Sequence, residues 1–151
     1  MATFQPASDT YEDLIRTSFS KQGFMATLGA SLVTVEPEFV AIGFPYHEKL
    51  TQQHDFVHAG ALSAIVDTAG GFAALSLYEA GDGVLTVEFK INLLAPADGD
   101  RFLARAEVVR PGRTLTVTKG EVVAIKDDQE KVCAIMQQTM MRVVGRSDVV
   151  G

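Results

Sequence analysis

One stretch of the chain, residues 59–78, constrains the possible fold more strongly than any other. It is rich in alanine, leucine and glycine, and its apolar residues recur at the three- and four-residue spacing of an α-helix. Small or apolar residues cover most of its circumference, and a helix of that kind is buried on nearly all sides. The pair Gly70 and Gly71 lowers helix propensity in the interior, which indicates very close packing against a neighbouring element.

Strand-like runs on both sides of this helix predict a sheet that encloses it. Residues 32–35 and 39–42 flank a turn at 36–38 and predict a β-hairpin. After the helix come four further runs, separated by turn-forming residues, at 84–93, 101–110, 114–126 and 131–144. We therefore expect one α+β domain over residues 1–151, in which the hairpin and a four-strand antiparallel meander form a curved sheet around one long central helix.

A shorter helix is predicted near the N-terminus, at about residues 8–22. Ser8 or Asp9 could cap its start, and Gly23 suits its end. Its single apolar stripe is typical of a packing or lid helix. The polar, irregular segment 45–57 before the central helix is expected to be a loop.

Composition narrows the class of protein. With 151 residues, 47% of them hydrophobic and 21% charged, the chain is long and apolar enough to bury one core. No apolar run reaches the roughly 18 residues of a membrane span, and the N-terminus lacks the pattern of a signal peptide. The net charge of −6 disfavours nucleic acid as a partner, although a local basic patch could still bind a small phosphorylated ligand.

The single cysteine, Cys133, excludes an intrachain disulfide and fits a reducing cytoplasm. It lies in an alternating apolar run, so we expect a packed core thiol and not a nucleophile. His47, His54 and His58 share one loop, but no nearby set of residues has zinc-ligand spacing, so we expect no metal site.

Asp67 is the most informative polar residue, because it lies in the middle of the apolar helix. Its helical neighbours three and four positions away are small and uncharged, so no local salt bridge accounts for the carboxylate. Burial of an unpaired carboxylate is costly. A hydrogen bond to a loop, or contact with water, is the structural explanation, but in this apolar setting we favour a functional carboxylate.

The residues at the start of the same helix, His58, Ala59 and Gly60, form a second feature. The first turn of a helix presents free N–H groups and the positive end of the helix dipole. Such a terminus can stabilise the oxyanion that develops during acyl transfer. Every helix has an N-terminus, and histidine often caps one, so this feature alone does not identify a function.

Together, residues 52–67, QQHDFVHAGALSAIVD, resemble the signature of hotdog-fold acyl-CoA thioesterases of the phenylacetic-acid-degradation type. In that family a His-Gly-Gly at the helix start follows an Asn, and an Asp comes nine residues after the His, as Asp67 comes nine after His58. The segments 87–97, VEFKINLLAPA, and 111–114, PGRT, resemble the family's next strand and its Gly-Arg/Lys-Thr turn. The resemblance covers roughly residues 29–144 and implies the hotdog fold.

The resemblance implies hydrolysis of an acyl-CoA thioester to a free acid and CoA. Asp67 would act as general base or nucleophile, and Thr86 would assist the attacking water. The backbone N–H of Ala59, together with that of Gly60, would form the oxyanion hole. Gln52 would take the place of the family's Asn, which positions water or substrate.

The resemblance also implies how the substrate is held. The turn formed by Arg110, Gly112 and Arg113 would lie near the CoA phosphates. Independently of the resemblance, the apolar residues Ala59, Phe72 and Phe89 suggest a tunnel for the acyl group, although they could equally belong to the core. No cofactor is implied, because CoA is part of the substrate.

Two residues depart from the family pattern. Ala59 replaces the first Gly of His-Gly-Gly, which keeps the backbone N–H but adds a methyl group beside the acyl or pantetheine path. Gln52 replaces Asn, so its amide reaches one methylene further, and Gln53 and His54 are rival occupants of that position. Both departures bear more on the substrate and on the placement of water than on the fold.

Helix geometry adds a constraint on assembly. Ala59 and Asp67 are eight residues apart, which separates them by about 12 Å along the axis of one helix. A single carbonyl cannot be held by the first and attacked by the second at about 3 Å. We therefore expect a homodimer in which two subunits share each active site. Because the family often pairs its dimers, a homotetramer is the further expectation.

Three other interpretations remain open at this point. A hotdog dehydratase acting on 3-hydroxyacyl thioesters would pair His58 with Asp67, but the chain lacks the His-Phe-Pro-Gly loop of dehydratases. A non-catalytic acyl-CoA binder or sensor would need the apolar cleft and the basic turn but not Asp67. A purely structural interaction domain would leave Asp67 without a purpose.

Overall fold

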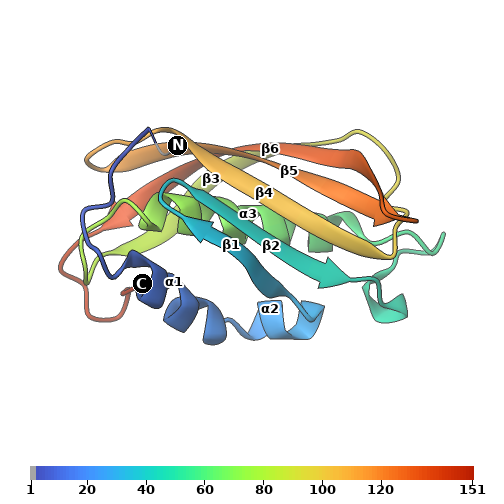
Figure 1. The fold of residues 1–151 in the computed structure, drawn as a ribbon, viewed down its shortest axis with the longest axis horizontal. Coiled ribbons are helices and arrows are strands. Elements are labelled where there is room, and N and C mark those ends of the chain that lie inside the picture. Colours follow the sequence, from blue (N-terminus) through green and yellow to red (C-terminus); the bar gives the residue numbers. More distant parts are fainter. Residues whose placement is uncertain (1–2) are drawn as a thin grey trace.

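The computed structural model describes residues 3–151 and consists of one sheet and three α-helices (Figure 1). The elements in chain order are α1 (Tyr11–Ser20), α2 (Gly23–Leu28), β1 (Ser31–Glu36), β2 (Phe39–Pro45), the short 3-10 helix η1 (Glu48–Leu50), α3 (Ala59–Leu75), β3 (Gly83–Leu93), β4 (Arg101–Arg110), β5 (Leu115–Lys126) and β6 (Gln129–Val143). Within the described residues, no helix has the length and apolar character needed to cross a membrane.

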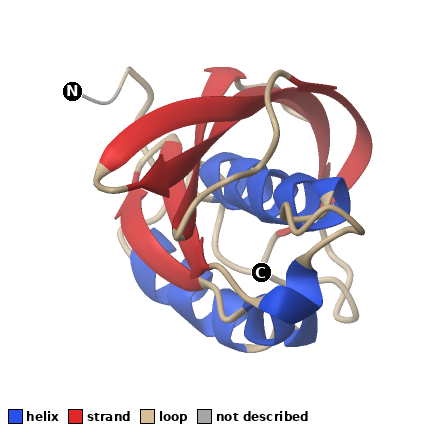
Figure 2. Ribbon diagram, turned by 90° about the vertical axis from the view of Figure 1, so that its right-hand side faces the viewer, coloured by secondary structure: helices blue, strands red, loops and turns tan. Residues whose placement is uncertain are grey.

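The six strands form one antiparallel sheet in the order β1-β2-β4-β5-β6-β3. Figure 2 shows the sheet curving around α3, with α1 and α2 as a further helical layer below. The predicted α+β architecture, a curved antiparallel sheet around one long helix, is confirmed. The predicted hairpin is β1 and β2, and the four later strands lie close to their predicted positions.

The core fills the space between α3 and the concave face of the sheet. Of the 17 residues of α3, 11 are buried, as the apolar circumference of the segment predicts. On the strand β6, every second residue from Ala134 to Met140 is buried against the helix, while Ile135 and Gln137 face outward and are exposed. This alternation is the period of a strand with one covered face.

Gly70 explains why a glycine pair interrupts so apolar a helix. A Cβ atom placed on Gly70 would lie 2.1 Å from Oε1 of Gln138 on β6, closer than any real contact allows. At Gly71 the nearest atom to such a Cβ is Cγ1 of Val84, at an ordinary 4.0 Å. The close packing predicted for this pair is therefore real at Gly70 and absent at Gly71.

The position of β3 corrects the predicted meander. In a meander β3 would lie beside β4, but it pairs with β6 at the far edge of the sheet, and β4 pairs with β2 instead. The physical reason is that α3 crosses the concave face and delivers the chain to the opposite edge. Alternation within a strand sets which face is buried but does not select the neighbouring strand.

The N-terminal helix is shorter than the predicted 8–22. Ser8 does not cap it; its Oγ lies 2.8 Å from Oγ1 of Thr10 in a turn before the helix begins. At the other end Gln22 takes an extended conformation, with ψ of 101°. Gly23, predicted to end this helix, instead begins α2, which the sequence analysis did not anticipate.

The central helix also ends earlier than predicted, at Leu75 and not at Tyr78. The N–H groups of Leu77 and Tyr78 donate to carbonyls three residues back, so the last turn is tighter than an α-helix. The predicted loop 45–57 is irregular apart from η1 and an isolated bridge between Thr51 and Val57.

The two edges of the sheet differ in their cover. The edge strand β1 packs against α1. No strand among residues 3–151 pairs with the outer side of the edge strand β3, and β3 exposes several apolar side chains. These are Leu85 (45% exposed), Val87 (49%), Phe89 (48%) and Leu93 (55%). An apolar, unpaired edge is the kind of strand that another chain can extend.

Candidate active site

Asp67 lies on α3 beneath the open edge of the sheet, where it is half-buried and not fully enclosed. Its Oδ1 accepts hydrogen bonds from Thr86 Oγ1 at 2.8 Å and from Gln138 Nε2 at 3.1 Å. Within the described residues its Oδ2 has no partner, and no base forms an ion pair with it. The absence of a salt bridge agrees with the uncharged helical neighbours, and two neutral donors stabilise the carboxylate at this half-buried position.

Thr86 is brought to Asp67 by an irregularity in β3. The register between β3 and β6 shifts between Thr86 and Glu88, so Val87 is an extra residue in the ladder. Bulges of this kind re-aim side chains and are frequent beside active sites. The bulge lets Thr86 and Phe89 both lie on the concave face, opposite Met140 and Gln138 respectively.

Gln138 belongs to this cluster, although the sequence analysis missed it. It is 1% exposed, and its Oε1 accepts a hydrogen bond from Thr118 Oγ1 at 3.1 Å. The available signal was a polar residue at an alternating position whose neighbours on the same face, Ala134, Met136 and Met140, are apolar. The local sequence pattern does not show that β6 packs against α3, so this polar residue could not be connected with Asp67.

The start of α3 is capped by His58, whose Nδ1 accepts a hydrogen bond from the Gly60 N–H at 2.8 Å. The Gly60 N–H, proposed as a second oxyanion donor, is thus engaged inside the cap. Among residues 3–151, the N–H of Ala59 has no acceptor. The helix start therefore offers one free donor, at the positive end of the helix dipole.

Beside this donor is a hollow of about 600 Å³. Gln52, His58 and Ala59 line one side, and the segment 93–97 after β3 lines the other. The Oε1 of Gln52 accepts a hydrogen bond from the N–H of His54, which closes a turn in the loop. Since Oε1 is held there, the Nε2 group of Gln52 is the part of this side chain that can meet a ligand.

The predicted site residues fall into two groups at opposite ends of β3. One group contains Asp67 and Thr86, and the other contains Ala59 with the hollow beside Leu93. Thr86 and Leu93 are seven residues apart, about 23 Å of extended strand. A single chain therefore does not assemble the complete predicted site.

The basic turn lies at the Asp67 end. In the sheet, Thr86 is opposite Met140, and Met140 is opposite Thr116, so Thr116 lies about two strand spacings, roughly 10 Å, from Thr86, and the turn precedes Thr116 at this end of the sheet. Arg110 and Arg113 are exposed, and in the described part of the chain neither forms an ion pair. Two guanidinium groups without an ion-pair partner in the described residues could bind phosphate groups at this end of the sheet.

Gly112 gives this turn its shape. A Cβ on Gly112 would lie 2.0 Å from the carbonyl oxygen of Leu115, so only glycine fits. The Gly112 N–H also approaches Thr116 Oγ1 at 3.5 Å. The glycine thus lets the turn fold back tightly between its two arginines.

Three further residues have clear positions. Phe72 is 3% exposed and packs against Phe19, with ring centroids 6.3 Å apart, so it belongs to the core. Phe89, by contrast, is 48% exposed on β3 and is free to contact a ligand. Cys133 is fully buried, as predicted, and burial raises the pKa of its thiol, which disfavours the nucleophilic thiolate.

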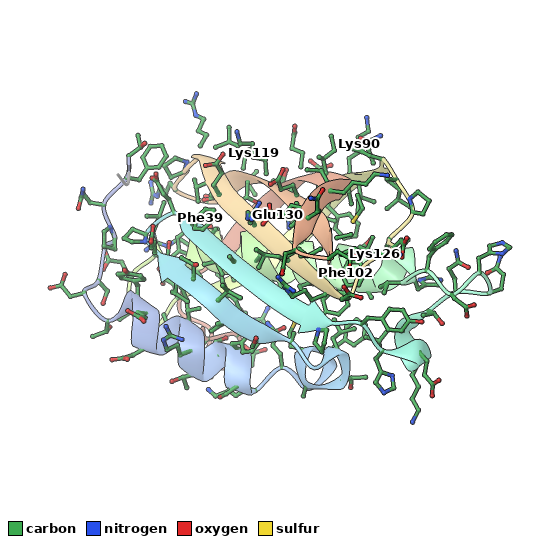
Figure 3. The ribbon with its side chains drawn as sticks, turned by 45° about the vertical axis from the view of Figure 1, so that its right-hand side comes forward. Phe39, Lys90, Phe102, Lys119, Lys126 and Glu130 are labelled. Carbon is green, nitrogen blue, oxygen red and sulfur yellow. The ribbon has the colours of Figure 1, made fainter. Side chains whose placement is uncertain are left out.

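A second hollow, of about 640 Å³, lies on the convex face of the sheet and contains none of the predicted site residues. Lys90 and Lys119 project outward from this face (Figure 3). Lys119 pairs with Glu107 at 2.9 Å, and Arg105 pairs with Glu130 at 2.6 Å. These pairs form a solvated, charge-compensated surface.

Comparison with known proteins places this geometry in context. The sequence pattern of the "Thioesterase superfamily" matches residues 54–131. A putative esterase of Halobacterium salinarum is 34% identical over 125 residues, which are 80% of this chain and 82% of the relative. A 1,4-dihydroxy-2-naphthoyl-CoA hydrolase of Listeria monocytogenes is 25% identical over 118 residues, which are 78% of this chain and 94% of the relative.

Solved structures show the same fold. A thioesterase family protein from Silicibacter pomeroyi is 50% identical, with a TM-score of 0.88 over 89% of this chain and 99% of its own. The PaaI protein of the Escherichia coli phenylacetic acid degradation operon is 22% identical, with a TM-score of 0.80 over 91% of this chain and 96% of its own. At that identity the second likeness concerns the fold alone.

Proposed function

The chain belongs to the thioesterase superfamily and has its hotdog fold, and on this basis we propose that it hydrolyses acyl-CoA thioesters to a free acid and CoA. The observation that carries the proposal is Asp67, a carboxylate held by two neutral donors on one oxygen, with its other oxygen free. A thioester hydrolase needs such a group to activate water or to attack the carbonyl carbon. No cofactor is required, because CoA is part of the substrate.

As general base, Asp67 takes a proton from a water molecule while the water oxygen attacks the thioester carbonyl carbon. The N–H of Ala59 stabilises the oxyanion that forms. The carbon–sulfur bond then breaks, and the proton passes to the departing CoA thiolate. As nucleophile, an oxygen of Asp67 would instead attack the carbonyl carbon and expel the CoA thiolate, which takes a proton from water. Water would then hydrolyse the resulting anhydride to the free acid and the Asp67 carboxylate. In both routes Gln52 orients water or substrate.

Binding of CoA is assigned to Arg110 and Arg113, which are exposed at the Asp67 end of the sheet and form no ion pair among the described residues, so both can pair with phosphates. Phe89 offers an apolar surface on the concave side for the acyl chain. The similar Listeria enzyme is named for a CoA thioester of an aromatic acid, which supports acyl-CoA as the substrate class here. The acyl group itself is left to a substrate panel.

We further propose that each active site uses two subunits. The apolar edge of β3 supports this, since a second copy that pairs with it would extend the sheet. An antiparallel pair of β3 strands would set the Asp67 end of one subunit against the Ala59 end of the other. That arrangement brings the two groups of site residues together. It also agrees with the separation of about 12 Å between Ala59 and Asp67 along one helix, which prevents the two from acting on one carbonyl within a single chain.

The test is release of free thiol from a panel of acyl-CoA thioesters by the wild-type protein and by Asp67→Asn. We expect turnover by the wild type and a loss of about 10²–10⁴-fold in kcat for the variant, with the oligomer unchanged. Binding without thiol release would instead favour a sensor. Loss of water across the acyl chain would favour a dehydratase, and near-normal turnover by Asp67→Asn would refute the role of Asp67.

A further inference from the structure

Gln138 is the only buried glutamine in the described structure, and the residues next to it on the same face of β6, Met136 and Met140, are apolar. A buried amide is costly unless its donors and acceptors are satisfied. Its Oε1 accepts from Thr118 Oγ1 at 3.1 Å. Its Nε2 lies 3.1 Å from both Oδ1 and the backbone oxygen of Asp67, and 3.4 Å from the backbone oxygen of Val66.

The side-chain oxygen of Asp67 is the acceptor that most depends on Gln138. The carbonyl groups of Val66 and Asp67 already have helical partners four residues ahead, because both lie inside α3. Oδ1 has no helical partner, and its second donor is the Thr86 hydroxyl. Loss of Gln138 would therefore remove half of the donors that hold the carboxylate.

The orientation of the Gln138 amide is determined by its neighbours. If the amide were turned by 180°, its oxygen would face Oδ1 of Asp67 and the two helix carbonyls, all of which are acceptors. The Thr118 hydroxyl, which is fully buried on β5, donates to the oxygen from the other side. Thr118 thus keeps the Nε2 group directed at Asp67.

A glycine in α3 makes space for this contact and lowers the stability of the helix. Only a glycine at position 70 leaves space for the Gln138 amide, since a Cβ there would lie 2.1 Å from Oε1. A glycine inside a helix costs about 1 kcal/mol relative to alanine. A leucine or methionine on β6 opposite an alanine on α3 would pack the same layer without either penalty.

From these contacts we infer that Gln138 is a positioning residue for Asp67. Thr118 orients its amide group, and Gly70 leaves the space that the amide occupies. It fixes the carboxylate so that Oδ1 is engaged by Gln138 and Thr86 while Oδ2 faces the water and the substrate. This inference rests on the proposed function of Asp67. It adds a chain of hydrogen bonds that runs from Thr118 on β5 through Gln138 on β6 to the Asp67 carboxylate.

The test compares steady-state kinetics with the substrate that the panel identifies. Gln138→Met keeps the volume but removes the donor, and we expect kcat to fall about 10–100-fold because the carboxylate is no longer held in place, with little change in KM. Thr118→Val should lower kcat to a smaller extent, and Thr118→Ser, which retains the hydroxyl, should restore it. Met136→Leu, on the same face of β6, is the control for a change in core packing alone.

Thermal unfolding of each variant separates positioning from mere packing. A lowered Tm with unchanged kcat in Gln138→Met would overturn the inference, as would equal kcat in Thr118→Val and Thr118→Ser. If Gln138→Met does not fold, the Thr118 pair decides the outcome. Because Asp67→Asn is measured alongside, high turnover by that variant would refute the proposed function itself, whereas loss of turnover there with an active Gln138→Met would refute only this inference.

Discussion

Thr86 contributes one hydroxyl group to the site, and this hydroxyl donates to Asp67 Oδ1 at 2.8 Å. A hydrogen bond to a charged group is worth about 1.5–3 kcal/mol, so Thr86→Val should lower kcat about 10–100-fold. Thr86→Ser retains the donor and should keep most of the activity. Steady-state kinetics on both variants checks this. Equal activity of the Val and Ser variants would show that the hydroxyl has no part in turnover.

At the residue scale, the sequence predicts those site residues that lie in a short contiguous motif. His58 and Asp67 are nine residues apart, and Thr86 follows on the next strand, so spacing and resemblance were enough to single them out. Gln138 is 71 residues from Asp67 and meets it only because β6 packs against α3. No local pattern encodes such a contact, whereas the cap in which His58 accepts from the Gly60 N–H spans only two residues.

The glycine pair of α3 gives a prediction at the scale of the element. Alanine at position 70 would clash with Gln138, so Gly70→Ala should lower the free energy of unfolding by about 1–3 kcal/mol despite better helix propensity. Gly71→Ala is the matched control, because a Cβ there has ordinary contact with Val84 and should raise the free energy of unfolding by up to about 1 kcal/mol. Chemical denaturation measures both. Equal stability of the two variants would contradict the packing described at Gly70.

Most elements could be predicted, and their arrangement could not. Alternation located all six strands, and apolar coverage identified α3 as the enclosed helix. The predicted strand order was wrong for β3, because its alternating pattern is compatible with any neighbouring strand. The predicted bounds of the N-terminal helix were wrong, because the chain leaves the helical conformation at Gln22 and a second helix begins at Gly23.

The edge of β3 gives a prediction for the whole molecule. Val87 is 49% exposed at this edge, and a lysine there would place like charges near each other if two copies pair through β3. Val87→Lys should therefore produce a monomer with little activity. Val109→Lys is the matched control, since Val109 is also 49% exposed but lies on β4, away from that edge. Sedimentation of both variants checks the assembly, and an active dimer of Val87→Lys would contradict it.

Activity of mixed subunits tests most directly whether two chains share each site. Asp67→Asn removes the proposed base from one subunit, and Ala59→Pro removes the proposed oxyanion donor from the other. Proline is tolerated at the first position of a helix. His58, with φ of −64° and ψ of 139°, already has the conformation preferred before proline. The two variants therefore remove one functional group each with little change to the fold.

Each variant alone should be inactive. After the two are mixed, unfolded and refolded together, half of the dimers should contain one of each, and one of the two sites in such a dimer has both groups intact. The account predicts recovery of about one quarter of the wild-type activity. If the mixture stays as inactive as its parts while mixed dimers demonstrably form, Asp67 and Ala59 do not act across the subunit boundary, and the shared active site is wrong.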